Sequence, residues 1–343
     1  MTVVPGAPGT AVVSEISEPL ADAGAVLVEG LLVGICGTDV EIVRGGHGRC
    51  PPGEDRLVLG HESLGRVLAA PPESGLAPGD LVAGIVRRPD PLPCEPCAQG
   101  RWDFCRNGGF TERGIKELPG YGAERWRVDS RYAVRVDAAL DELGVLVEPA
   151  SVASKAWDRI ELLARGAPWT PRTVLVTGAG PIGLLSALVA VQRGYDVHVL
   201  DLVTEGPKPG LVADLGATYH QGSVGDLGFA PDLAVECTGV GALAFDVVEH
   251  VAPGGVVCLT GISGGRPGRA DLSAVNRDIV LGNTVVFGAV NAARAHYEEA
   301  VQTLAAADHG WLSRLVSRRV PLDRWPAALQ KGRDDVKVVV ELR

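Results

Sequence analysis

The stretch Thr173-Val-Leu-Val-Thr-Gly-Ala-Gly-Pro-Ile-Gly183 determines the expected fold, because a run of mostly β-branched residues leads directly into a glycine-rich turn. A long apolar segment follows, so the pattern predicts a buried strand, a tight turn and a helix. The glycines have the G-x-G-x-x-G spacing that lets backbone amides approach a pyrophosphate at a helix N-terminus. The predicted dinucleotide-binding turn comprises Gly178, Gly180, Pro181, Ile182 and Gly183.

A carboxylate follows the next predicted strand, residues 196–200. Asp201 stands where an acidic side chain accepts hydrogen bonds from the ribose hydroxyls of adenosine. Its charge would repel the extra phosphate of NADP, so we expect NAD as the cofactor; Lys208 could counter that charge, which keeps NADP as an alternative. Thr238 and Gly261 follow two later strands, at the edge where parallel sheets bind ligands, and complete the expected cofactor site in this part of the chain.

Strand and helix patterns alternate on both sides of the glycine-rich turn. Strands are expected at 173–177, 196–200, 233–236, 256–260 and 284–287, with helices at 181–193 and 208–215. This alternation predicts an α/β fold with a doubly wound parallel sheet, the Rossmann arrangement. Short β-like runs rich in glycine and proline precede it and predict a small, irregular β-barrel. We therefore expect a catalytic domain over 1–150, a dinucleotide-binding domain over 151–290, and a C-terminal return to the catalytic domain over 291–343.

Charge and composition exclude several classes of function. The 343 residues carry 32 basic and 42 acidic side chains, a net charge of −10, which disfavours binding to nucleic acid or to anionic membranes. Residues 173–192 carry no charge and are long enough to span a bilayer, but the glycine-rich turn would break a spanning helix. The first residues lack the basic and apolar regions of a signal peptide. We expect a cytoplasmic protein with a small-molecule substrate.

Cysteine and histidine placement indicates metal binding. Three of the seven cysteines lie at 94, 97 and 105, and such clustering without a signal peptide favours metal ligation over disulfides. Elsewhere, Cys36 lies in Gly34-Ile-Cys-Gly-Thr-Asp39, and the pair His61-Glu62 follows it by 25 residues. A thiolate, an imidazole and a carboxylate are ligands that zinc accepts, and a catalytic zinc site leaves one position open.

In these motifs and their order, the chain resembles the zinc-dependent medium-chain alcohol dehydrogenases over nearly its whole length. Shorter segments at 86–88, 110–115, 147–149 and 290–291, together with His296, resemble the glucose 1-dehydrogenase branch of that family. The resemblance implies a GroES-like catalytic domain beside the Rossmann domain, and a homo-oligomer that is a dimer or a tetramer.

The resemblance also implies roles at the catalytic metal. Cys36, His61 and Glu148 would face the zinc, with Glu62 as a nearby or alternating ligand. Thr38 would pass the substrate proton toward the cofactor ribose. Two plainer interpretations remain open: Glu148 could serve only the start of the helix that follows it, and Thr38 could cap local backbone.

The cysteine lobe departs from the pattern of the family, whose structural zinc has four cysteine ligands. Cys94, Cys97 and Cys105 match three of them, but the first position falls on Pro91, which cannot bind a metal. Asp90 is adjacent and could take its place. The lobe therefore either holds a structural zinc with one aspartate and three cysteines or carries metal-free thiols.

Polar residues carried over from the glucose 1-dehydrogenase branch indicate the substrate. Such groups would pair with several hydroxyls, and a site of this kind rejects analogues that leave them unsatisfied. The expected substrate residues are Glu112, Glu148, Asn291 and His296, and Asn291 is also expected to contact the cofactor. Glu112 could instead form a solvated pair with Arg113, and His296 could be an ordinary helix-start residue.

These expectations define an oxidoreductase that uses zinc and NAD(P) to take a hydride from a polyhydroxylated substrate. The substrate is either an aldose oxidised at its anomeric carbon, such as glucose, or a cyclitol-like alcohol. Three alternatives remain: a dehydrogenase of simple alcohols, a zinc-free quinone reductase, and a non-catalytic dinucleotide-sensing or metal-binding protein.

Overall fold

The computed structural model describes residues 1–21, 24–263 and 271–343, which form two compact units. Unit 1 comprises Met1–Ser151 and Asn291–Arg343, and unit 2 comprises Val152–Val290. The chain thus enters unit 2 within one helix, α3 (Val147–Ala164), and returns to unit 1 for its last 53 residues, 291–343.

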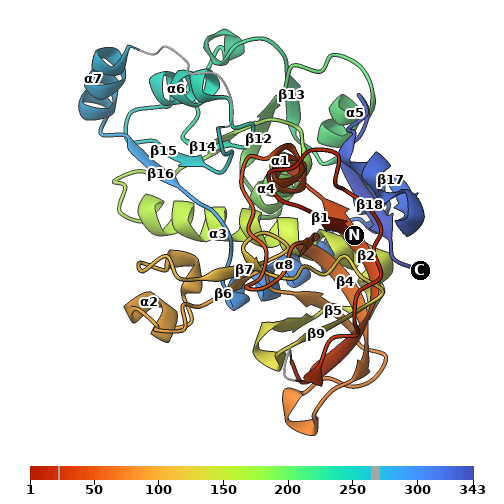
Figure 1. Ribbon diagram of the computed structural model, residues 1–343. Helices are drawn as coiled ribbons and strands as arrows, with labels where there is room; N and C mark the ends of the chain where they lie inside the picture. The colour runs from red at the N-terminus through yellow and green to blue at the C-terminus, as the bar shows by residue number, and fades with distance from the viewer. Residues whose placement is uncertain (22–23, 264–270) are drawn as a thin grey trace. The chain divides into compact units, whose positions relative to one another are not determined.

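Unit 1 is built on a seven-stranded sheet with the order β10-β5-β4-β2-β18-β17, in which β9 also pairs with β2. These strands are β2 (Val26–Ile35), β4 (Glu62–Ala69), β5 (Leu81–Gly84), β9 (Arg125–Val128), β10 (Ala133–Arg135), β17 (Val316–Pro321) and β18 (Lys337–Glu341). The blue strand β18 runs antiparallel to the red strand β2 (Figure 1), with Val340 opposite Val33. Two strands from the C-terminal part of the chain, β17 and β18, therefore extend the sheet formed by residues 26–135.

Smaller elements surround this sheet. They are the strands β1 (Thr2–Val3), β3 (Leu57–Val58), β6 (Arg87–Arg88), β7 (Thr111–Arg113) and β8 (Glu117–Leu118), and the helices α1 (Gly37–Arg44), α2 (Glu95–Ala98), α8 (Arg294–Ala305) and α9 (His309–Leu315). Short 3-10 helices lie at Pro72–Ser74, Trp102–Phe104, Ser130–Tyr132, Ala138–Leu146 and Leu322–Leu329. β6, β7 and β8 form a sheet of their own, which carries the polar network described below.

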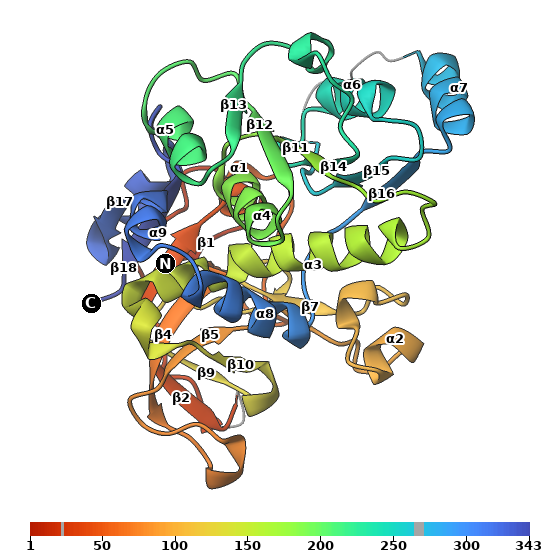
Figure 2. The same cartoon turned by 180° about the vertical axis from the view of Figure 1, so that it is seen from behind.

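Unit 2 contains a six-stranded parallel sheet with the order β13-β12-β11-β14-β15-β16. Its strands are β11 (Thr173–Thr177), β12 (Asp196–Leu200), β13 (Thr218–His220), β14 (Leu233–Glu236), β15 (Val256–Leu259) and β16 (Val285–Gly288). Besides the larger part of α3, the helices are α4 (Pro181–Gln192), α5 (Pro207–Asp214), α6 (Gly241–His250) and α7 (Leu272–Gly282), with a 3-10 helix at Val224–Leu227. Figure 2 shows α4 beside β12, against which it packs.

Burial explains why the central strands could be recognised. Val174, Leu175 and Val176 of β11 are all inaccessible to solvent, as expected for a parallel strand covered on both faces. β11, β12 and β14 have the bounds predicted from sequence, and the doubly wound sheet is confirmed.

No helix within the described ranges combines the length and apolar character needed to cross a bilayer. The uncharged stretch 173–192 forms β11, the glycine-rich turn and α4.

Candidate metal, dinucleotide and substrate sites

Cys36, Asp39 and His61 come together at the start of α1 in unit 1. The Cys36 Sγ lies 2.9 Å from His61 Nε2, and Asp39 Oδ1 lies 3.5 Å from His61 Nδ1. The backbone N–H of Cys36 donates to Asp39 Oδ2, and the backbone N–H of Thr38 donates to Cys36 Sγ. These two bonds cap the helix and fix the thiol and the carboxylate on either side of the imidazole. A carboxylate behind a histidine is the usual device for orienting a metal ligand.

The charges in this cluster support one another. Burial disfavours a protonated His61, but the neighbouring Cys36 and Asp39 outweigh it and raise the pKa of His61 well above 6.5. Burial likewise opposes ionisation of Asp39, yet His61 holds the pKa of Asp39 below its usual value. The cluster therefore stabilises positive charge between the sulfur of Cys36 and the carboxylate of Asp39. Sequence reasoning did not assign Asp39 a role, although its spacing of three residues from Cys36 is that of a helix-capping pair.

Glu62 and Glu148 also come close to His61. One ligand atom from each of these three buried residues lies within 4.8 Å of the others. Glu148 occupies the first turn of α3, and its pKa is raised to about 7, mainly by burial, with His61 opposing the shift and Glu62 adding to it. A carboxylate whose charge is disfavoured in this way gains from a nearby cation.

A buried lysine holds Glu62. The Nζ of Lys337 donates to both carboxylate oxygens of Glu62, at 2.6 and 2.5 Å, and to the carbonyl of Ile35 at 3.3 Å. Gly34 faces Glu62 across β2 and β4, and a Cβ at Gly34 would lie 2.0 Å from Glu62 Oε2. The glycine therefore leaves room for the carboxylate. Lys337 was not predicted as a site residue, although a charge in the valine-rich final strand signals a buried partner.

The donor set at this site fits zinc. Cys36 contributes a thiolate, His61 an imidazole nitrogen, and Glu62 and Glu148 carboxylate oxygens, and His61 belongs to both of the ligand groups. One sulfur, one nitrogen and one oxygen would leave a fourth position for substrate. The side-chain hydroxyl of Thr38, two residues after Cys36, has no hydrogen-bond partner among the described residues.

The cysteine lobe holds a second cluster. The sulfur atoms of Cys94, Cys97 and Cys105 lie within 4.8 Å of one another. Bonds from backbone N–H groups, led by Arg106, lower the pKa of Cys94 to about 7, whereas burial raises the pKa of Cys97 to about 11.

Asp90, the expected fourth ligand, is not among the groups gathered there. Its carboxylate instead accepts the backbone N–H groups of Leu92 at 2.8 Å and Gly109 at 3.1 Å. The structure therefore places Asp90 as a support for the loops that carry the thiols.

The glycine-rich turn in unit 2 has the geometry that the spacing requires. Gly178 adopts a φ of 90°, which favours glycine, and a Cβ at Gly183 would lie 1.8 Å from the carbonyl oxygen of Gly178. Gly180 begins α4 without a side-chain cap, and Pro181 and Ile182 form the first turn. The helix N-terminus is thus available to a phosphate.

Asp201 lies directly beside this turn. Its Oδ2 accepts the backbone N–H of Ala179 at 2.6 Å and forms an ion pair with Lys208 at 3.1 Å. Its Oδ1 accepts the backbone N–H of Val203 at 3.0 Å. Burial opposes the charge, but these partners outweigh it and lower the pKa of Asp201. The site therefore presents an anion whose charge Lys208 partly balances.

A second carboxylate organises the neighbouring strand ends. Glu236, at the end of β14, accepts the backbone N–H of Thr238 at 2.7 Å, and its main-chain carbonyl accepts the N–H of Gly261. A Cβ at Gly261 would lie 2.0 Å from the nitrogen of Gly239, so the two loops require glycine where they meet. Thr238 and Gly261 are thereby brought together as expected, whereas Glu236 was missed.

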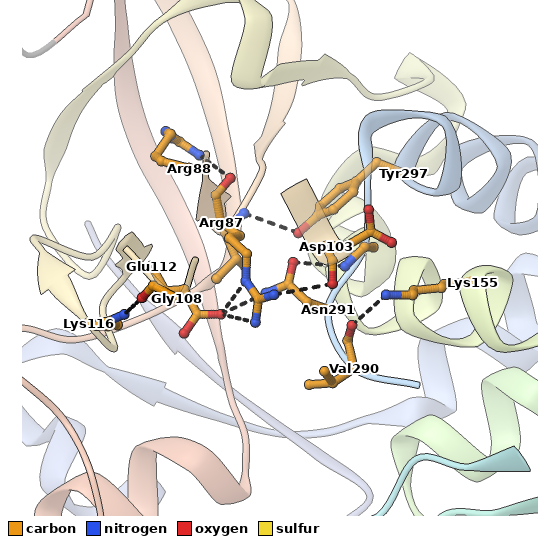
Figure 3. A network of polar contacts seen from close by, with 12 residues as sticks. Arg87, Arg88, Asp103, Gly108, Glu112, Lys116, Lys155, Val290, Asn291 and Tyr297 are labelled. Carbon is orange, nitrogen blue, oxygen red and sulfur yellow. Dashed lines mark hydrogen bonds and ion pairs between the residues drawn. The ribbon is translucent and has the colours of Figure 1, made fainter. Parts of the chain in front are cut away.

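A polar network in unit 1 surrounds Glu112 on β7 (Figure 3). Glu112 Oε1 accepts from Arg87 Nε at 3.0 Å, from Arg87 Nη2 at 2.9 Å, and from Asn291 Nδ2 at 2.9 Å. Arg113 donates instead to the carbonyls of Pro119 and Arg127. The alternative of a solvated pair between Glu112 and Arg113 is therefore wrong, and Glu112 and Asn291 lie together as expected.

His296 has a local bond of its own. It is buried in the first turn of α8, where its Nδ1 accepts the backbone N–H of Ala293 at 3.0 Å. The next residue, Tyr297, accepts the N–H of Val86 through its hydroxyl at 3.3 Å. The bond of His296 to Ala293 is that of a residue at the start of a helix, and a contact with substrate stays a prediction.

Comparisons with known proteins cover both halves of the chain. The family model described as "Alcohol dehydrogenase GroES-like domain" matches residues 22–138, and "Glucose dehydrogenase C-terminus" matches residues 141–342. The chain is 38% identical to glucose 1-dehydrogenase 1 of Caldivirga maquilingensis and 37% identical to glucose 1-dehydrogenase of Thermoproteus tenax. These alignments cover 100% of this chain and 98% and 99% of those proteins.

A solved structure is similar over the same span. The glucose dehydrogenase of Haloferax mediterranei, in complex with NADP, zinc and gluconolactone, has a TM-score of 0.91 and 33% sequence identity. The match covers 100% of this chain and 98% of that chain. Fold, domain order and sequence thus agree with one set of relatives.

Proposed function

Because this chain belongs to the glucose dehydrogenase branch of the zinc-dependent medium-chain alcohol dehydrogenases, we propose that it oxidises an aldose at its anomeric carbon. It is a zinc- and NAD(P)-dependent oxidoreductase that acts on sugars. The observation that carries the proposal is the set of Cys36 with the buried His61, Glu62 and Glu148, in which thiol and imidazole lie 2.9 Å apart.

Each residue of the metal site has a distinct task. Cys36, His61 and Glu148 would hold zinc, with Glu62 beside them. When bound, zinc supplies a positive charge that favours ionisation of the substrate hydroxyl, and the dinucleotide supplies the hydride acceptor. Asp39 keeps the His61 ring oriented, and the Thr38 hydroxyl would accept the substrate proton while passing its own proton toward the cofactor ribose.

Glu112 and Asn291 support a polyhydroxylated substrate. The Glu112 side chain is only 13% exposed in unit 1; Arg87 and Asn291 engage one oxygen, and the other has no partner among the described residues and could accept from a sugar hydroxyl. A simple alcohol has no further hydroxyl to pair with this carboxylate. The carboxylate would then be left unsatisfied, which lowers the turnover of the alcohol relative to that of a sugar. We propose that an aldose hydroxyl occupies this position, with a cyclitol as the second candidate.

A substrate panel tests this proposal. Aldoses, cyclitols and short alcohols are each offered with NAD and with NADP, and the absorbance of the reduced nicotinamide is followed. We expect the highest kcat/KM with an aldose such as glucose. Faster turnover of short alcohols than of any sugar would overturn the proposal.

For the dinucleotide, we propose a preference for NAD that Lys208 keeps small. The Haloferax mediterranei relative holds NADP, and the ion pair of Asp201 with Lys208 weakens the repulsion that the carboxylate exerts on a ribose phosphate. Asp201→Asn keeps an accepting oxygen but removes the charge, so we expect the kcat/KM ratio of NADP to NAD to rise about tenfold. Lys208→Gln is the matched variant and should lower the same ratio. A ratio that neither substitution moves would contradict this assignment.

Two further properties follow as proposals. The three thiols of the cysteine lobe would hold a second, structural zinc, with Asp90 bracing the loops around it rather than serving as the fourth ligand. A dimer or tetramer is the expected assembly, which sedimentation of the purified enzyme would measure.

A further inference from the structure

We infer that Arg87 determines the charge of the sugars that this enzyme accepts: by pairing with Glu112, it makes the site suited to uncharged sugars and unsuited to cationic ones. The inference rests on the proposed function, since it assumes that Glu112 contacts the sugar. It concerns a residue that lies behind the proposed substrate-binding carboxylate.

Among the described residues, all the hydrogen bonds to the Glu112 side chain fall on one of its two carboxylate oxygens. Two nitrogens of Arg87 and the amide of Asn291 converge on Oε1, at 2.9 to 3.0 Å. Oε2 accepts no hydrogen bond from the described residues and is not among the buried atoms without partners, so it remains accessible. Arg87 thus binds the carboxylate from one side and leaves one oxygen for a ligand.

Arg87 cannot easily move away from this position. Its Nη1 donates to the carbonyl of Asp103 at 3.3 Å, and its guanidinium carbon lies 3.9 Å from the centroid of the Phe110 ring. The side chain is 9% exposed. In Figure 3 it lies between Glu112 and Asp103, which places its charge on Glu112 before any substrate arrives.

The neighbouring charges leave the pair close to neutral. The Asp103 carboxylate lies 3.6 Å from Arg101. The ammonium group of Lys116 donates to the carbonyl of Gly108 and lies 4.0 Å from the centroid of the Phe110 ring. A sugar hydroxyl therefore meets an acceptor oxygen whose charge is already compensated. An ammonium group at the same position would be repelled by the guanidinium of Arg87, and the Glu112 carboxylate, already paired, would not offset that repulsion.

Removing either partner should shift the preference in opposite directions. Arg87→Gln leaves the Glu112 carboxylate without its cation in a partly buried site, which attracts an ammonium. Glu112→Gln leaves the guanidinium uncompensated, which repels one. A merely structural role for Arg87 would lower activity toward all sugars alike and would not move their ratio.

The experiment compares D-glucosamine with D-glucose in the zinc- and dinucleotide-loaded enzyme, at a pH at which the amine is protonated. For Arg87→Gln we expect the kcat/KM ratio of glucosamine to glucose to rise about tenfold, as befits a charge-assisted hydrogen bond. For Glu112→Gln we expect the ratio to fall. Arg88→Gln is the matched control on the same strand, where the side chain bonds Ile85 and Tyr121, and the ratio should stay unchanged.

The outcomes are separable. Ratios that stay constant in both variants, or that move in the same direction, overturn the role of Arg87 while leaving glucose oxidation intact. If Arg87→Gln fails to fold, Glu112→Gln alone decides, because an unchanged or raised ratio there overturns the inference. A wild-type enzyme that oxidises neither sugar overturns the proposed function itself.

Discussion

Replacement of His61 by alanine is expected to lower kcat/KM for the sugar by about 10³-fold or more, because it removes the only nitrogen ligand of the proposed zinc site. His61 lies in both ligand groups, one with Cys36 and Asp39 and the other with Glu62 and Glu148. Its loss should also lower the zinc content of the purified protein. The measurements are steady-state kinetics and elemental analysis on the same preparation.

A graded series makes this test sharper. Asp39→Asn keeps all ligands but weakens the orientation of the imidazole, so we expect a smaller loss of about 10- to 100-fold in activity or metal affinity. His198→Ala is the control: His198 belongs to unit 2 and pairs with His220, and zinc content should be unaffected. An alanine variant at His61 that retained full zinc and near-normal turnover would refute the proposed ligand set.

Replacement of Lys337 by methionine is expected to destabilise the protein by about 3–5 kcal/mol, because it leaves Glu62 as an uncompensated buried charge. Lys337 is buried, and among the described residues it is the only side chain that donates hydrogen bonds to Glu62. Chemical denaturation followed by circular dichroism would measure the loss of unfolding free energy.

The paired variant separates charge from packing. Adding Glu62→Gln to Lys337→Met removes the stranded carboxylate and should recover part of the lost stability. Lys331→Met, at an exposed lysine near the same strand, should change stability by no more than about 0.5 kcal/mol. If Lys337→Met and Lys331→Met were equally mild, the ion pair with Glu62 would not have the importance assigned to it.

The central strands of unit 2 were predictable because local sequence and burial agree. β11, β12 and β14 are β-branched or apolar runs with clear boundaries, and the structure places them at the predicted residues. Other elements gave weaker signals: α6, α7 and β13 were not predicted. α7 does carry recognisable ends, with Asp271 as its N-cap and Asn283 in the left-handed conformation at its C-terminus.

The candidate site was predictable to the extent that it lies within short motifs. Cys36, His61 and Gly178 were found because their spacing is itself constrained by a helix cap, a strand start and a tight turn. The partners of those residues were harder to find. Lys337 reaches Glu62 from 275 residues away, and Arg87 reaches Glu112 from a neighbouring strand, so only the sheet pairing reveals them.

The partners of Asp90 could not be read from the sequence either. Asp90 stands next to the cysteines in sequence, which made it a natural candidate for a ligand. In the folded lobe, its carboxylate accepts the backbone N–H groups of Leu92 and Gly109. Proximity along the chain did not reveal that these backbone N–H groups would bind the carboxylate of Asp90.

The most direct test of the account is an anomalous difference map at the zinc absorption edge, from crystals of the purified enzyme. We predict a peak about 2.3 Å from Cys36 Sγ and about 2.0–2.1 Å from His61 Nε2, and a second peak among the three thiols of the cysteine lobe. Zinc-replete crystals without density between Cys36 and His61 would contradict the central claim that these two residues share a metal ion.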